Sequence, residues 1–361
     1  MRIRAISVLV LSLGVLASTT GFTTPSLTTT GPTSQSDLGW DLSPTGVTAR
    51  LRGLSVVDES VVWASGSGST VLRTVDGGRT WQQVGPKVEP TLQFRDIEAF
   101  DADHAVILSI GPGAESRVYR TDDGGQTWVE TFRNDDDRAF YDCMAFFDRS
   151  RGLALSDPVD GRFRILSTTN GGRSWRVLPA AGMPPALDGE FAFAASGTCL
   201  VTADSGPDIA WFATGGGSAA RVFRSDDRGY TWQVTDTPVP SGPTAGIYSL
   251  AFRNSWHGVA VGGDFAVPDA APDGAAVTGS GGATWRRAAR PPGEYRSGSA
   301  WISPFLWVAI AVGPTGSDIS YDGGNTWGRF DDGSFDAVDC AAGLVCWASG
   351  EQGRVAALRW R

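Results

Sequence analysis

The fold of this chain is decided by one stretch of sequence, Thr74-Val75-Asp76-Gly77-Gly78-Arg79-Thr80-Trp81. The same phrase returns five more times, as TDDGGQTW (121–128), TTNGGRSW (168–175), SDDRGYTW (225–232), TGSGGATW (278–285) and SYDGGNTW (320–327). The intervals between successive tryptophans of the phrase are 47, 47, 57, 53 and 42 residues. A period of this size is typical of a propeller or a solenoid.

The residues between two copies of the phrase divide into short apolar runs separated by turn residues. In the first unit these runs are 49–57, 61–65, 70–74 and 81–84, and the repeated phrase forms the turn between the last two. Four short strands per repeat make one blade of a β-propeller.

The repeated phrase predicts a structural turn. Its Ser or Thr hydroxyl and its carboxylate can hydrogen-bond the turn's own backbone, its glycines adopt positive φ, and its tryptophan fills space beside neighbouring strands. One carboxylate per phrase falls short of the roughly six to eight oxygens that Ca²⁺ takes, so we expect no metal site. The residues with this structural role are Asp76, Trp81, Asp123, Trp128, Asn170, Trp175, Asp227, Trp232, Trp285, Asp322 and Trp327.

A seventh unit is divided between the two ends of the chain. The runs 335–339, 346–350 and 353–358 match three strands, and the N-terminal run 39–42 can supply the fourth. A ring closed by strands from both termini hides its sheet edges and ties the chain ends together. The sequence therefore predicts an all-β fold, a seven-bladed β-propeller of four-stranded antiparallel blades over residues 38–361.

The phrase Ser/Thr-x-Asp-Gly-Gly-x-Thr-Trp resembles the Asp-box, or bacterial neuraminidase repeat. Blade phrases such as Phe94-Arg95-Asp96-Ile97-Glu98-Ala99-Phe100 are similar to the photosystem II stability/assembly factor-like branch of that superfamily. The resemblance covers residues 38–361 and implies the propeller fold. It does not fix the function, because the repeat occurs in sialidases, sorting receptors, cellulase-type enzymes and non-catalytic assembly factors.

The composition predicts a large exported globular protein. Hydrophobic residues make up 41% of the chain, with 47 glycines and 14 tryptophans, which favours many short strands over a helical bundle. The N-terminus carries a basic tip followed by the apolar run 5–17, which is typical of a cleaved signal peptide over residues 1–20. Residues 21–37 predict a disordered Thr/Ser/Pro leader. We expect a secreted, cell-wall or periplasmic protein.

The mature chain is acidic. The formal net charge is −9, and loss of Arg2 and Arg4 with the signal leaves 28 basic and 39 acidic side chains, a net charge of −11. Such a surface repels nucleic acid and anionic membranes. No internal apolar run reaches the length of a membrane span, about 20 residues. The chain has no dinucleotide-binding or Walker phrase, so we expect no cofactor. We also expect a monomer.

The four cysteines give one pair and one open question. Cys340 and Cys346 are predicted to form a disulfide, because a tight hairpin through 341–345 places them opposite each other. For Cys143 and Cys199 a second disulfide and two buried free thiols both stay open.

The innermost strand of each blade lines the central channel of a propeller, so its residues are the candidates for function. Aligning these strands superposes Arg52-Gly53, Arg95-Asp96, Tyr141-Asp142, Glu190-Phe191, Tyr248-Ser249, Arg296-Ser297 and Asp336-Ala337. One interpretation is a ring of ion pairs that holds the blades together, with Arg95 paired to Asp96 and Asp142. The other is an anionic ligand held by arginine. The ligand-binding candidates are Arg52, Arg95, Asp96, Tyr141, Asp142, Glu190, Tyr248 and Arg296.

Longer segments in blades three to five are candidates for the rim of such a site. They cover 156–161, 210–217 and 263–273 and account for the two longest intervals. Asp157, Trp211 and Asp264 are the ligand-binding candidates in them. For Trp211 the alternative is that it covers a small core of its own loop.

A catalytic alternative is a sialidase-like glycoside hydrolase, in which arginines bind a carboxylate while Tyr, Glu and Asp do the chemistry. Tyr141, Glu190 and Asp96 supply those residue types. The Arg-Ile-Pro phrase of sialidases is absent, and the predicted blade count differs from theirs. We therefore predict a non-catalytic binding or assembly platform whose partner is a protein segment or an acidic glycan.

Overall fold

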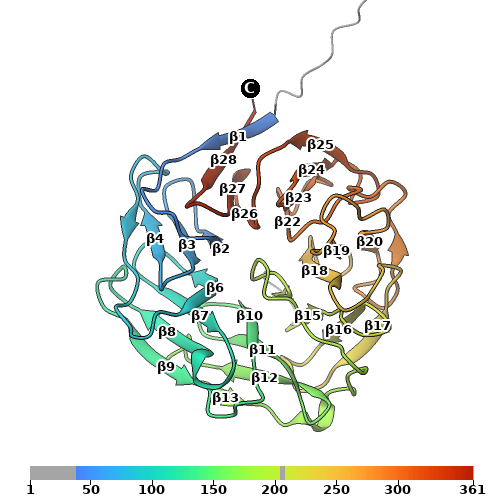
Figure 1. The fold of residues 1–361 in the computed structure, drawn as a ribbon, viewed down its shortest axis with the longest axis horizontal. Coiled ribbons are helices and arrows are strands. Elements are labelled where there is room, and N and C mark those ends of the chain that lie inside the picture. The colour runs from blue at the N-terminus through green and yellow to red at the C-terminus, as the bar shows by residue number, and fades with distance from the viewer. Residues whose placement is uncertain (1–37, 204–207, 361) are drawn as a thin grey trace, which may run out of the picture. The chain divides into compact units, whose positions relative to one another are not determined.

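Seven four-stranded antiparallel sheets surround a central channel in the computed structural model (Figure 1). The structure describes residues 38–203 and 208–360. It confirms the predicted all-β propeller and its blade count. The predicted signal peptide and leader, residues 1–37, lie outside the described residues. In the described part of the chain, no helix has the length and apolar character needed to cross a bilayer.

The blades follow one another along the chain, each running from the channel outward. The strands of blades one to three are β2 (Leu51–Val56), β3 (Val62–Gly66), β4 (Val71–Thr74), β5 (Gln82–Gln83), β6 (Gln93–Ala99), β7 (Ala105–Ile110), β8 (Arg117–Thr121), β9 (Val129–Arg133), β10 (Tyr141–Phe146), β11 (Gly152–Val159), β12 (Arg162–Thr168) and β13 (Arg176–Val177). The strands of blades four to six are β14 (Leu200–Thr202), β15 (Ala210–Ala213), β16 (Arg221–Ser225), β17 (Gln233–Asp236), β18 (Ala245–Phe252), β19 (Gly258–Asp264), β20 (Ala275–Thr278), β21 (Arg286–Arg287), β22 (Gly298–Trp301), β23 (Ala309–Gly313), β24 (Gly316–Ser320) and β25 (Gly328–Asp331). Two 3-10 turns, η1 (Gly113–Glu115) and η2 (Ala180–Gly182), join strands.

Blade seven is built from both ends of the chain, as the sequence predicts. Its order is β1 (Leu38–Leu42), β28 (Val355–Trp360), β27 (Val345–Ser349) and β26 (Ala337–Ala341). The register of β1 on β28 runs from Leu38 opposite Trp360 to Leu42 opposite Ala356. The N-terminal strand therefore covers the outer edge of the last sheet and closes the ring.

Each repeated phrase forms a turn between the third and fourth strands of its blade. In blade one the Thr74 hydroxyl donates to Asp76 Oδ1 at 2.8 Å and accepts from the Gly78 N–H at 3.0 Å. Asp76 also accepts from the N–H and the hydroxyl of Thr80, at 2.9 and 2.7 Å. Blade five lacks the acid, and its Ser280 hydroxyl accepts from the Thr284 N–H at 2.9 Å. The turn thus keeps its shape without a carboxylate.

The hydrophobic core lies between neighbouring sheets. Trp211 is fully buried on β15, stacks on Phe252 of blade five at 3.8 Å and donates to the Gly281 carbonyl at 2.8 Å. The prediction of Trp211 at the rim is wrong, because β15 is the second strand of blade four and its residues face the packed interface with blade five.

Two disulfides are present among the described residues. Cys340 and Cys346 lie opposite each other on β26 and β27 and are bonded. Cys143 on β10 is bonded to Cys199, which precedes β14. The second bond joins blades three and four and excludes the alternative of two free thiols.

Candidate functional site

The innermost strands all run in the same direction along the channel, so the channel has one mouth at their starts and one at their ends. Arg50 and Asp336, at the starts of β2 and β26, line a first cavity of about 470 Å³. Ser55 and Asp339, near the ends of the same two strands, line a second cavity of about 250 Å³. The two cavities therefore open toward opposite faces of the propeller.

Residues 193–198, here called the plug, separate the two cavities. Phe193, Ala194 and Ala195 line the first cavity, and Ser196, Gly197 and Thr198 line the second. In Figure 1 the yellow-green loop that reaches the centre of the ring is this part of the chain. The alignment of Glu190-Phe191 with the innermost strands is wrong, because the chain enters the channel there and starts its innermost strand, β14, only at Leu200.

Blades on three sides of the channel hold the plug. The Arg95 guanidinium donates to the Ala194 carbonyl at 3.1 Å, and the Ser196 hydroxyl donates to the Ser297 carbonyl at 2.7 Å. The Thr198 hydroxyl donates to Ser249 Oγ at 2.7 Å. The predicted pairing of Arg95 with Asp96 and Asp142 is wrong, since this arginine contacts the plug backbone instead.

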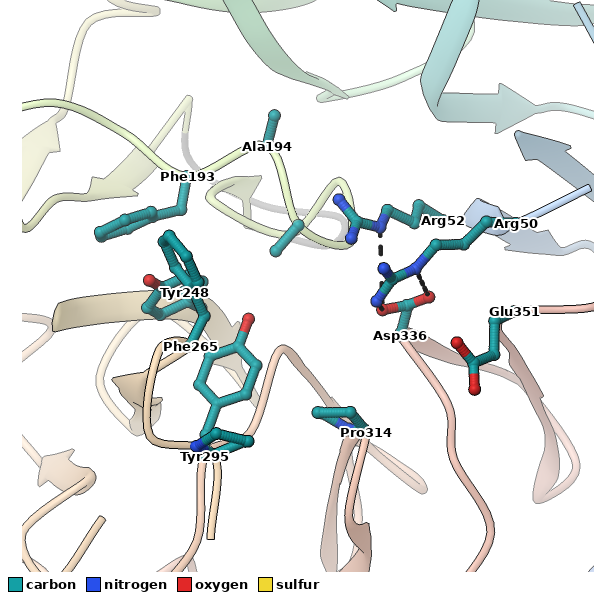
Figure 2. Close-up of a pocket in the computed structure, with 12 residues that line it drawn as sticks. Arg50, Arg52, Phe193, Ala194, Tyr248, Phe265, Tyr295, Pro314, Asp336 and Glu351 are labelled. Atoms are coloured by element: carbon teal, nitrogen blue, oxygen red, sulfur yellow. Dashed lines mark hydrogen bonds and ion pairs between the residues drawn. The ribbon is translucent and has the colours of Figure 1, made fainter. Parts of the chain in front are cut away.

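The polar wall of the first cavity is made by Arg50, Arg52, Asp336 and Glu351 (Figure 2). Arg50 donates to both oxygens of Asp336, at 2.7 and 2.6 Å, and this hydrogen bonding raises the pKa of Arg50. The Arg52 Nε lies 3.7 Å from Asp336 Oδ1, beyond hydrogen-bonding distance, and it is buried without a hydrogen-bond acceptor. Burial lowers the pKa of Arg52 from its ordinary value. One guanidinium in this wall is satisfied, and the other retains an open donor.

A β-bulge aims Arg52 at the cavity. The register of β2 on β3 shifts between Leu51 and Gly53, which leaves Arg52 unpaired across the sheet. The same shift occurs at Arg95, Asp142 and Tyr248 in blades two, three and five. Bulges re-aim side chains. The sequence alignment of the innermost strands superposes three of these positions, Arg52, Arg95 and Tyr248, and is one residue off in blade three, where it aligns Tyr141 with them and the bulge is at Asp142.

The opposite wall of the first cavity is aromatic. Tyr248 stacks on Phe193 at 3.8 Å, meets Tyr295 edge-on at 4.7 Å and contacts Phe265 at 6.4 Å. The Tyr248 hydroxyl donates to the Thr244 carbonyl at 2.7 Å, and burial raises the pKa of both tyrosines. The Tyr295 hydroxyl points toward the cavity in Figure 2.

The second cavity has a carboxylate floor. Asp96 accepts from the Ile97 and Met144 N–H groups at 2.8 and 2.6 Å, and Asp339 accepts from the Val56 N–H at 2.7 Å. Burial raises the pKa of Asp96 to about 8. Within 38–203 and 208–360, no three His, Cys, Asp or Glu side chains form a group that could hold a metal ion.

Two further acids lie at the base of the plug. Asp157 accepts from the Ala192 N–H at 2.9 Å, and burial raises its pKa to about 7. Asp142 is fully buried, and its pKa is raised by burial and by the neighbouring Asp157. Asp157 therefore holds the residue before the plug against blade three, and Asp142 Oδ2 is buried without a hydrogen-bond partner in the described part of the chain.

The structure does not bring the sialidase candidates together. Glu190 is buried and accepts from Arg221, from the Thr214 hydroxyl at 2.6 Å and from the Leu187 N–H at 2.8 Å. Tyr141 lies in the core against Phe132, at 5.4 Å. Asp96 belongs to the second cavity. The residues named for catalysis therefore lie in three separate environments.

Arg296 and Asp264 also have hydrogen-bond partners within the protein. Arg296 is 1% exposed and donates to Asp318 at 2.7 Å and to Thr315 at 2.9 Å. Arg296 is thus in an ion pair, but its partner belongs to its own blade, so this pair does not hold two blades together as predicted. Asp264 accepts from the Ala266 N–H at 2.9 Å and begins the loop that brings Phe265 to the first cavity.

Sequence reasoning missed several residues of the first cavity. Arg50 and Glu351 precede or follow strands, and Phe193 belongs to the plug. The one signal in the sequence was the position of Arg50, two residues before Arg52 and thus on the same side of an extended chain. The repeat marks the plug only through the 57-residue interval between Trp175 and Trp232, which the sequence prediction attributed to 210–217; residues 210–213 are instead the regular strand β15.

No family model and no curated protein matches this chain. Solved structures resemble it in fold. "YCF48 bound to D1 peptide" is 16% identical over 89% of this chain and 96% of that chain, with a TM-score of 0.63. "YCF48 from Cyanidioschyzon merolae" is 16% identical over 89% and 98%, with a TM-score of 0.62, and the WD40 β-propeller domain of Doa1 is 12% identical over 90% and 97%, with a TM-score of 0.61. At these identities the likeness establishes the β-propeller fold, which these structures and this chain share.

Proposed function

We propose that this protein is an exported binding platform whose first cavity takes a protein segment. The segment presents a carboxylate to Arg52 and an apolar side chain to the aromatic wall. The observation that carries the proposal is the Arg52 Nε, which is buried beside the cavity without an acceptor.

The charges of the polar wall favour an anionic group in the ligand. Two guanidinium groups share the buried Asp336, and the better hydrogen bonds go to Arg50. A buried N–H donor without an acceptor is costly, and a charge-assisted hydrogen bond to a carboxylate contributes about 1.5–3 kcal/mol. A carboxylate of the ligand would thus give Arg52 a hydrogen-bond acceptor that the described residues do not provide.

The aromatic wall favours a ligand with an apolar side chain beside that carboxylate. Phe193, Tyr248, Phe265 and Tyr295 pack against one another, so the wall is already formed without a ligand. Preformed walls reduce the ordering cost of binding. A fold neighbour solved with a D1 peptide supports a protein segment as the ligand class.

An acidic glycan would present the same carboxylate chemistry and is kept as a competing outcome of the test. We do not propose sialidase activity, because its candidate residues lie apart. We further propose an Asp-box relationship, supported by the turn geometry of the six phrases, and a monomeric protein exported by its N-terminal segment. Secretion of a tagged full-length chain and sedimentation of the mature protein test these two properties.

The binding test uses synthetic peptides in which Asp, Glu or a free C-terminus follows an aromatic residue, with amide-capped Asn and Gln versions and sialyllactose as comparison ligands. Wild-type protein should bind the acidic peptides better than their neutral versions by about tenfold or more. Arg52→Ala should abolish that preference, and Arg52→Lys should restore part of it. Arg79→Ala, on the exposed turn of blade one, is the matched control.

Two results would contradict the proposal. Equal binding of acidic and neutral peptides would show that Arg52 does not select the ligand. Binding of sialyllactose alone, sensitive to Arg52→Ala, would identify an acidic glycan as the ligand.

A further inference from the structure

The face opposite the first cavity carries an exposed aromatic patch on blades five and six. The patch is defined by Trp256, Phe305, Leu306, Trp307 and Tyr321, whose exposed fractions are 61%, 86%, 42%, 46% and 59%. Three of these residues belong to the turn between β22 and β23, which lies at the end of an innermost strand. The first cavity lies at the starts of those strands, so the patch and the cavity face opposite ways.

The propeller supplies its own comparison for this patch. Asp58 begins the corresponding turn of blade one and accepts from the Ser60 and Val61 N–H groups. Asn254 does the same in blade five, accepting from the Trp256 and His257 N–H groups at 2.9 Å each. Trp256 thus occupies the position of Ser60 in a turn with the same backbone hydrogen bonds. The turn does not require its side chain, and exposed apolar groups of this kind mark interaction sites.

The Trp307 ring of the patch is held in place by its neighbours before any partner binds. The Arg253 guanidinium lies over the Trp307 ring at 4.4 Å and donates to the Leu306 carbonyl at 3.0 Å. His257 meets the same ring edge-on at 4.8 Å, and the Gly323 N–H donates to the Trp307 carbonyl at 3.0 Å. Tryptophan, tyrosine and arginine side chains are enriched at binding hot spots, and side chains that are already ordered lose less entropy on binding.

The charges around the patch indicate the chemistry of its partner. The cation that lies against the rings of the patch is Arg253, and Asp322 of blade six is a carboxylate whose two oxygens accept from Ser320 and Thr326 of its own turn. A partner with carboxylates beside apolar side chains would complement this surface. A second copy of the same patch would instead bring the Arg253 guanidinium groups of both copies together.

A protein partner also fits the rest of this face better than a membrane does. The corresponding turns of blades two and three carry Asp101, Asp103, Asp148 and Arg149. A flat bilayer against this face would remove these charges from water at a high cost. A protein segment can cover blades five and six alone.

We propose that the aromatic patch is a second docking site, which binds a protein segment with apolar side chains flanked by Asp or Glu. It is independent of the first cavity. With two sites on opposite faces, the propeller holds two different segments at once.

The test uses a displayed library of random peptides selected on the wild-type protein. The selected peptides are then measured on Trp256→Ser/Phe305→Ser, on Arg52→Ala and on Val129→Ser, which removes an exposed apolar side chain from β9 as a matched control. Trp256→Ser copies the serine of blade one, so the double variant should fold, and its circular dichroism and urea midpoint check this.

The proposal expects one class of peptides that is rich in aromatic and acidic residues. This class should lose about tenfold or more in affinity on the double variant and keep its affinity on Arg52→Ala and Val129→Ser. If no such class appears, or if its peptides carry no acidic residues, the proposal is wrong.

Two further measurements would also overturn it. Binding to vesicles of phosphatidylglycerol and phosphatidylcholine that the double variant loses would make the patch a membrane site. Self-association in sedimentation that the double variant loses would make it a contact between copies of this chain.

Discussion

Gly197→Ala is the substitution that tests how the channel is closed. Gly197 lies in the plug with φ of +81°, and a Cβ added there would be 2.5 Å from Asp96 Oδ1. That oxygen cannot move away easily, because Asp96 is held by the Ile97 and Met144 N–H groups. The plug therefore has to shift, carrying Phe193 and Ala194 with it.

The magnitude has two parts. Placing a non-glycine residue in the left-handed region costs about 1–2 kcal/mol, of which the reduced entropy of the unfolded chain returns about 0.4–1 kcal/mol. Forcing a methyl group into an occupied space adds about 1–3 kcal/mol. We expect Gly197→Ala to lower the free energy of unfolding by about 2–4 kcal/mol.

Gly343→Ala separates the two parts. Gly343 has φ of +82°, and a Cβ added to it would meet no atom within 4 Å, so its substitution measures the backbone cost alone. Urea unfolding of both variants, followed by tryptophan fluorescence, measures the difference. If Gly197→Ala is no more destabilising than Gly343→Ala, the plug does not rest on Asp96 and the described closure is wrong. Weaker binding at the first cavity should accompany the larger loss of stability.

Three other changes test the fold. Because the pKa of Asp96 is raised to about 8, its contribution to stability is complete below about pH 4 and is lost as the pH rises toward 8. Asp96→Asn should therefore remove about 1.4 kcal/mol per pH unit from the slope of the unfolding free energy between about pH 5 and 7. An unchanged slope would contradict the conclusion that Asp96 is protonated in the folded protein. Cys199→Ser removes a disulfide with a sequence separation of 56 and should lower the free energy of unfolding by about 4 kcal/mol, against about 2 kcal/mol for Cys346→Ser, whose disulfide has a separation of 6. The difference arises because a longer closed loop restricts the unfolded chain more. Urea unfolding without reductant that gives the reverse order would contradict this explanation. Asp322→Asn should keep the turn of blade six, because Asn170 makes the corresponding contact in blade three. Asp322→Ala should lower the thermal midpoint, because it removes the hydrogen bonds from Thr326. Equal midpoints for the two variants would show that these hydrogen bonds contribute nothing to stability.

The fold was predictable because it follows from a short sequence pattern that repeats along the chain. The turn phrase depends on contacts within eight residues, such as those of Asp76 with Thr74 and Thr80, so its sequence pattern and its geometry coincide. The alignment of the innermost strands also placed Arg52 and Tyr248 correctly, since each falls on a bulge at an equivalent position.

The predicted partners of individual charged residues were less accurate than the predicted fold. Whether an arginine is free or paired depends on residues far away in the chain. Arg296 finds Asp318 within its blade, whereas Arg95 reaches the plug, 99 residues away. No local pattern distinguishes the two cases.

By itself, the sequence determined the architecture: seven blades, their turns and the closure of the ring by both chain ends, because these follow from a repeat whose contacts are short-range or between equivalent neighbours. The position of a cavity with an unpaired donor depends instead on contacts between distant parts of the chain. In the folded chain the plug lies in the channel and both oxygens of Asp336 accept from Arg50. The Arg52 Nε has no acceptor among the described residues, in a cavity whose opposite wall is aromatic. The physical reason is that the partners of a buried charge are chosen by three-dimensional proximity, which a single insertion in blade four was enough to change.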